Sequence, residues 1–87
     1  MIEEIKEAFK NYVFVSVEFE NGHQHTIKAY GTHNIDPVTL EKDFEANMRY
    51  IKYVENNEHT EVWDVLFSND EEEAKEREII TEDGGFL

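Results

Sequence analysis

The sequence predicts a small α+β domain in which helices cover one face of a mostly antiparallel sheet. Apolar residues recur at helical spacing in residues 2–10 and 37–47, and alternate with polar residues at strand spacing in residues 12–20. Asn21-Gly22 follows the alternating segment and is a strong signal for a β-hairpin. We therefore expect the 87 residues to form one domain in the order helix–hairpin–helix–hairpin–helix, in which residues 79–87 could be a loose tail.

Residues 2–10 fit a short amphipathic helix. Ile2, Ile5 and Phe9 recur at i, i+3 and i+7, with charged residues between them. Two glutamates near the start and Lys10 at the end suit the helix dipole.

The length of the hairpin loop decides which side chains share a face of the sheet. A two-residue loop at Asn21-Gly22 would place Thr26 and Lys28 beside the valines of residues 13–17. A three-residue loop at positions 20–22 places Ile27 and Ala29 there instead, and a slip by one residue would expose all of them. The sequence therefore predicts the three-residue loop, with Gly22 in the left-handed conformation.

Residues 31–36 are expected to form a connection, after which Asp36 resembles an N-cap with Pro37 in the first helical position. A helix is predicted over residues 37–47. Residues 49–54 could extend it, because Ile51 continues the apolar stripe, but they are also rich in strand-forming residues. We assign a strand there, since Asn56-Asn57 indicates a turn and residues 60–67 resemble the partner strand of a second hairpin.

The last predicted helix covers residues 69–78. Ser68 and Glu71 have the spacing of a capping box, and the acidic residues that follow suit the first turn. Ala74 is its clear apolar interior residue, so this helix presents charge more than it builds core. Ile79 and Ile80 are candidates for anchoring its end.

The charge is concentrated in the C-terminal third of the chain. Residues 55–87 hold 12 acidic and 2 basic residues, whereas residues 1–54 hold 9 acidic and 6 basic residues, out of a total net charge of −13. Such a field repels nucleic acid and anionic membranes and attracts basic proteins. We therefore expect no direct nucleic-acid partner and no membrane partner, but a basic protein.

The sequence also predicts a cytoplasmic protein. It has no cysteine, which fits a reducing compartment. Its start lacks the basic and apolar regions of a signal peptide, and no apolar run approaches the roughly 20 residues of a membrane span.

The candidate partner-binding residues are carboxylates whose spacing resembles that of DNA phosphates. Carboxylates at i and i+2 of a strand lie about 6.5–7 Å apart, and those at i and i+4 of a helix lie about 5–6 Å apart at Cβ. Phosphates along one DNA strand are separated by about 6–7 Å along the helical path. The alternative is a solvated face that only confers solubility. The candidates are Glu18, Glu20, Glu58, Glu61, Asp70, Glu71, Glu72, Glu73, Glu76 and Glu78.

The remaining candidates favour structural roles. His23 and His25 could share a strand face, but a third zinc ligand at a defined spacing is missing, so we expect neither metal nor cofactor. No nucleophile or phosphate-loop motif is present, and we expect no catalytic residues and no enzyme. Trp63 and Phe67 are assigned to the core. Phe14 is either an interface anchor or covered by the C-terminal segment.

In size, absence of cysteine, β-rich α+β pattern and the carboxylates of residues 55–78, the chain resembles the small acidic DNA-mimic proteins of bacteriophages. The resemblance implies an inhibitor that occupies the DNA-binding face of a basic DNA-binding protein of the host, in the host cytoplasm. Within this class the inhibitors of the nucleoid protein HU are the most similar in style. No sequence motif is shared, so the class assigns no residue roles.

Three other functions remain open. An immunity protein or antitoxin that neutralises a basic toxin or nuclease would have the same electrostatics but one cognate partner. An anti-CRISPR or anti-restriction inhibitor would also act by charge. A metal-dependent enzyme would use His23 and His25, and would contain metal when purified.

Overall fold

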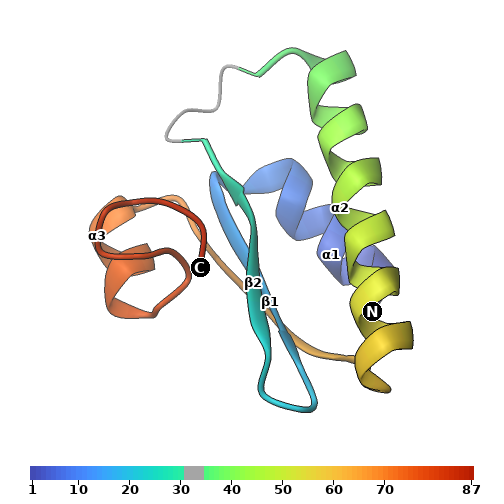
Figure 1. Ribbon diagram of the computed structural model, residues 1–87. Coiled ribbons are helices and arrows are strands. Elements are labelled where there is room, and N and C mark those ends of the chain that lie inside the picture. Colours follow the sequence, from blue (N-terminus) through green and yellow to red (C-terminus); the bar gives the residue numbers. More distant parts are fainter. Residues whose placement is uncertain (31–34) are drawn as a thin grey trace.

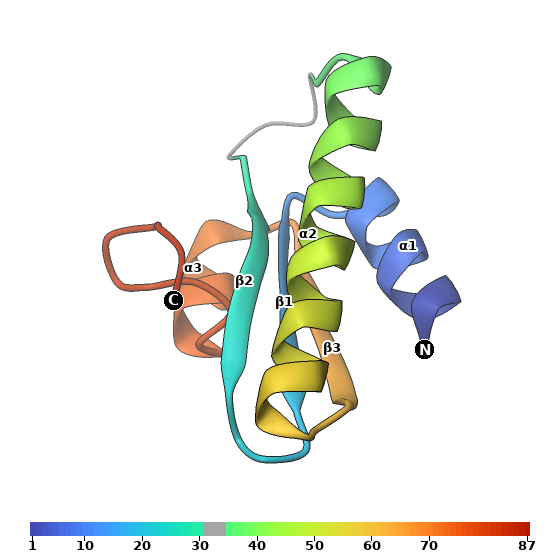
Figure 2. The same cartoon turned by 45° about the vertical axis from the view of Figure 1, so that its right-hand side comes forward.

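Three antiparallel strands form the centre of the molecule in the computed structural model, which describes residues 1–30 and 35–87 (Figure 1). The strand order is β2-β1-β3, so β1 is central and β2 and β3 are edges. Two helices cover one face of the sheet, and the third helix with the C-terminal segment covers part of the other (Figures 1 and 2). The elements are α1 (Ile2–Asn11), β1 (Phe14–Phe19), β2 (Gln24–Ala29), α2 (Pro37–Glu58), β3 (Val62–Ser68) and α3 (Glu71–Glu76).

The α+β class and the antiparallel sheet agree with the sequence, but two parts of the predicted architecture are wrong. The described residues form one hairpin, not two, because the segment before β3 is helical. Helices also cover both faces of the sheet, and not one face only (Figure 1).

Helix α2 continues to Glu58, through the segment predicted to be a strand. Its apolar stripe runs from Leu40 and Phe44 to Ile51 and Val54. Ile51 and Val54 are each 2% exposed. A strand over residues 49–54 would turn alternate side chains away from this core. The helical period of the buried residues therefore outweighs the strand propensity of the individual residues.

The larger core lies between the sheet and helices α1 and α2. Ile5 and Phe9 of α1 meet Val15 and Val17 of β1, and all four are at most 1% exposed. Burying such side chains stabilises the fold by about 1.5–3 kcal/mol each. Ile2, predicted to share this stripe, is 54% exposed.

A second core lies on the opposite face of the sheet. Phe14 packs there with Ala74, Ile79 and Ile80, all at most 3% exposed. Phe14 is therefore covered by the C-terminal segment. Val13 belongs to this second core, and not to the face of the other valines as predicted.

The hairpin has the predicted loop, and the predicted register is correct only near it. The Phe19 amide donates to the His23 carbonyl, Gly22 has φ 93°, and Glu18 lies opposite Gln24. Beyond Thr26 a β-bulge shifts the pairing by one residue, so that Lys28 and not Ile27 lies opposite Val15. Ile27 remains in the larger core, but Ala29 faces the second core.

Strand β3 pairs with β1, and a second β-bulge interrupts this pairing. Glu18 lies opposite Asp64, but the next residue, Phe19, lies opposite Val62. Strict alternation would have placed Trp63 opposite Phe19, in the core. The bulge leaves Trp63 as the extra residue and 66% exposed, so its assignment to the core is wrong. Phe67, also predicted in the core, is 37% exposed and packs on Tyr12.

Helix α3 is shorter than predicted and begins later. Its N-cap is Asp70, whose carboxylate accepts from the Glu73 amide, while the Ser68 hydroxyl accepts from the Asp70 amide. The helix ends at Glu76, so Glu78 lies outside it, with φ 58°. Ile79 and Ile80 do anchor its end.

The ends of the other segments are set by local hydrogen bonds. Asp36 caps α2 as predicted, accepting from the Thr39 amide at 3.1 Å with Pro37 in the first turn. The C-terminal segment returns to the sheet, where the Leu87 amide donates to the Thr26 hydroxyl.

Most of the connection predicted over residues 31–36 lies outside the described residues. Among the described helices, none has the length and apolar character to span a membrane.

Candidate protein-binding surface

Two carboxylates face each other across the sheet near the hairpin end. Glu18 of β1 and Asp64 of β3 are Cα partners, and both lie on the face opposite α1 and α2, because the neighbouring Val17 and Val65 belong to the larger core. Side chains directly opposite each other have Cβ atoms about 4.5–5.5 Å apart, and like charges there destabilise a sheet. Within the described residues, no lysine or arginine forms a salt bridge with either one.

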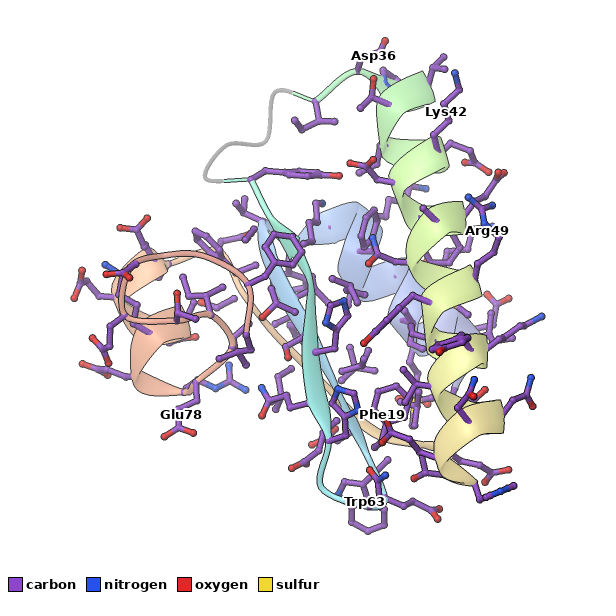
Figure 3. All side chains as sticks on the ribbon, viewed as in Figure 1. Phe19, Asp36, Lys42, Arg49, Trp63 and Glu78 are labelled. Atoms are coloured by element: carbon purple, nitrogen blue, oxygen red, sulfur yellow. The ribbon has the colours of Figure 1, made fainter. Side chains whose placement is uncertain are left out.

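Trp63 lies beside this carboxylate pair. Figure 3 shows its indole ring at the hairpin end of the molecule, outside the core. It borders a depression of about 360 Å³, whose other walls are Glu18, Phe19, Glu20 and Gly22. The exposed indole thus sits among carboxylates from two strands. We refer to Glu18, Glu20, Glu61, Trp63 and Asp64 as the hairpin-end surface.

Glu20 and Glu61 extend the acidic character toward the end of α2. The Glu20 amide donates to the Glu61 carbonyl at 2.9 Å, which holds the two residues side by side just past the paired strands. Both border a second depression, of about 500 Å³, with Glu55, Asn56 and His59 on its α2 side. The end of β1 therefore contributes Glu18 and Glu20 to the surface, and the adjacent start of β3 contributes Glu61 and Asp64.

Glu58, another predicted site residue, is used within the fold. Its carboxylate accepts from the Asn21 side chain at 2.8 Å and lies 3.0 Å from Nδ1 of His23. The hydrogen bond from Asn21, followed by that from His23, lowers the pKa of Glu58 below its usual value. This arrangement ties the hairpin loop to the end of α2, so Glu58 supports the hairpin-end surface.

The carboxylates of α3 form a separate group, and three of them form salt bridges with Lys75 or Arg77. Lys75 lies 3.5 Å from Glu71 and 3.9 Å from Glu72, and Arg77 lies 3.4 Å from Glu73. Asp70 is the N-cap of the helix. Glu72 and Glu76 lie one turn apart on α3, at the helical spacing compared above with that of DNA phosphates, whereas Glu78 lies outside the helix.

Gln24 links the segment after α3 to the hairpin. Its side chain donates to the Glu78 carbonyl at 2.7 Å, and its backbone is paired with Glu18. Lys42 and Arg49 lie on α2, on the opposite side of the molecule from Glu78 (Figure 3). The predicted site residues are thus divided between the hairpin end and α3. Other cations lie closer to them: Lys75 and Arg77 pair with carboxylates of α3, and Lys52 borders a depression together with Glu61.

The two hairpin histidines lie against aromatic rings. The His23 ring is 5.4 Å from that of Phe19, and the His25 ring is 4.4 Å from that of Tyr50. Burial, and secondly the charge of His23, lower the pKa of His25. In the described part of the chain, no three histidine or acidic residues are grouped as a metal site would require.

Lys28 is buried, which the sequence did not predict. Lys28 is 5% exposed; its Nζ donates to the Phe9 carbonyl and lies 5.1 Å and 5.4 Å from the ring centres of Phe9 and Tyr30. Burial lowers the pKa of Lys28, and burial together with the hydrogen bond to Asp43 raises that of Tyr30. Lys28 caps the end of α1, which is a structural role.

Trp63 is the surface residue that sequence reasoning missed. The signal that could have revealed it is the odd spacing of Val62, Trp63 and Val65, which strict alternation cannot bury on one face.

Comparison of the chain with protein-family models, with curated proteins and with solved structures gives no match in any of the three.

Proposed function

We propose that this protein is an inhibitor that binds the DNA-binding face of a basic protein and mimics the charge of DNA. The observation that carries the proposal is the opposed pair Glu18 and Asp64. A sheet gains nothing from two carboxylates directly opposite each other, so a cationic partner is the simplest reason for keeping them.

The shape of the charged surface supports the same function. The hairpin-end surface holds four carboxylates and no lysine or arginine, and Lys42 and Arg49 lie on the far side of the molecule from Glu78 (Figure 3). A local concentration of negative charge attracts a basic surface and raises the rate of association. The partner would then be met by the hairpin-end surface.

The class of target follows from the resemblance stated above and stays part of the proposal. A basic DNA-binding protein of the host cytoplasm is the expected partner, and an HU-like nucleoid protein is the first one to test. An immunity protein or antitoxin acting on a basic toxin, or an inhibitor of a CRISPR or restriction enzyme, would use the same surface.

The experiment is a pull-down from bacterial lysate with the immobilised protein, at low and at high salt. Glu18→Lys serves as the variant and Glu45→Lys, on the exposed side of α2, as the control with the same charge change. We expect a basic DNA-binding protein that is retained at low salt, released by salt and by added DNA, and lost with Glu18→Lys only. Retention of a single toxin or nuclease at high salt would favour the immunity function. No specific partner under either condition would contradict both.

A further inference from the structure

Trp63 is exposed because of how β3 is built. The bulge at this position moves the indole out of the core and gives its place opposite Phe19 to Val62. A tryptophan at 66% exposure forgoes most of the stabilisation that burial of its large ring would bring. Tryptophan is also one of the residues most often found at the energetic centre of protein interfaces.

No aromatic or cationic group of the described chain stacks on this ring. The aromatic contacts among residues 1–30 and 35–87 involve other rings, and the cation–π contacts are those of Lys28 with Phe9 and Tyr30. The indole is therefore free to receive a group from outside. Its neighbours in the depression, Glu18 and Glu20, determine the charge that such a group should carry.

We propose that Trp63 is the contact point for an arginine side chain of the basic partner, which stacks on the indole while carboxylates of the hairpin-end surface accept its hydrogen bonds. This inference rests on the proposed function and adds to it the location of the contact and the residue type it recognises. Arginine fits better than lysine, because the planar guanidinium both stacks on aromatic faces and binds carboxylates through paired hydrogen bonds.

Charge complementarity selects this occupant over the others. A second copy of the chain would bring the same carboxylates, Glu18, Glu20 and Asp64, against themselves. Nucleic acid could stack a base on the indole, but its phosphates would be repelled by a protein of net charge −13. A cation over the ring face is attracted by the ring itself, and more strongly beside carboxylates.

The test uses the fact that Trp63 is the only tryptophan in the chain, so that its fluorescence reports on this site alone. The full-length protein is titrated with hexa-arginine and with hexa-lysine peptides at low salt, by fluorescence and by calorimetry. We expect hexa-arginine to change the Trp63 emission saturably and to bind about five-fold more tightly than hexa-lysine. Trp63→Ala should abolish this preference, Trp63→Phe should keep part of it, and Tyr53→Ala should leave it unchanged, since Tyr53 is a similarly exposed aromatic residue on α2.

An unchanged emission on saturation, an equal affinity for the two peptides, or a preference that persists in Trp63→Ala would overturn the inference. Emission that changes with protein concentration alone would overturn it in favour of a second copy. A circular dichroism spectrum verifies that each variant is folded. Because no DNA-binding protein takes part, the inference can fail while the pull-down succeeds, and the pull-down can fail while arginine recognition is observed.

Discussion

Glu18 lies directly opposite Asp64 on the neighbouring strand, beside the exposed ring of Trp63. This relationship brings together two like charges and a large apolar surface, each of which costs stability when left unpaired. A basic partner would compensate for both. The hairpin end is therefore the part of the acidic surface on which the proposed function depends most.

Glu18→Lys should stabilise the protein and weaken its binding. The variant replaces a like-charge pair with an ion pair between the introduced lysine and Asp64, for which we expect a gain of about 0.2–1 kcal/mol in the free energy of unfolding. Urea denaturation measures this gain. Affinity for the basic partner should fall several-fold at low salt, whereas Glu45→Lys should change it little. A variant that loses stability would show that the pair is not repulsive.

Reversal of two charges on α3 tests the second group of carboxylates. Glu72 and Glu76 are exposed and one turn apart, and Glu72 is only weakly paired with Lys75, at 3.9 Å. We expect Glu72→Lys with Glu76→Lys to weaken binding several-fold without loss of helical signal. Calorimetry with the captured partner measures the effect. An unchanged affinity would remove α3 from the binding surface and leave the hairpin end alone.

The second core should be essential for attachment of the C-terminal segment. Ile79 is fully buried against Phe14, so Ile79→Ala should lower the free energy of unfolding by about 2–5 kcal/mol. Ile2→Ala, at a site that is 54% exposed, should change it by less than about 0.5 kcal/mol. Chemical denaturation of the two variants makes the comparison. A loss of stability in Ile79→Ala as small as the one expected for Ile2→Ala would mean that burial of Ile79 adds no stability.

His25 should make the protein less stable in mild acid. Its pKa is lowered below the usual 6.5 in the folded state, by burial and secondly by the charge of His23. The unfolded chain therefore binds more protons between that lowered pKa and 6.5, and the free energy of unfolding falls as the pH decreases through this window. Urea denaturation at several pH values should show this slope in the native protein and a smaller slope in His25→Gln. An NMR titration of the His25 ring above 6.5 would contradict the prediction.

The sequence predicted the elements whose signals are local. The hairpin loop follows from Asn21-Gly22, the start of α2 from Asp36 and Pro37, and the anchoring role of Ile79 and Ile80 from their position after a polar helix. Each of these depends on residues a few positions apart. The class of fold and the hairpin could be predicted for this reason.

The errors arise where distant packing decides. Residues 49–54 have strand propensity, yet their apolar side chains complete a helical stripe that meets α1 and the sheet. The two β-bulges shift the register by one residue each, which buries Lys28 and exposes Trp63. No glycine or proline marks either bulge, and alternation alone points both side chains to the wrong face. The candidate site could therefore be predicted by its charge, whereas the sign of its aromatic centre was the odd spacing of Val62 and Val65.

The most direct test of the proposed function is a competition experiment in which a basic nucleoid protein such as HU, or the protein captured from lysate, is bound to fluorescently labelled DNA. The native protein is added, and the fluorescence anisotropy of the DNA is followed at low salt. We predict that the DNA is released in proportion to the added protein, that Glu18→Lys releases less, and that Glu45→Lys releases as much. Anisotropy that stays constant while the native protein binds the target would show that it does not occupy the DNA-binding face, and would contradict DNA mimicry.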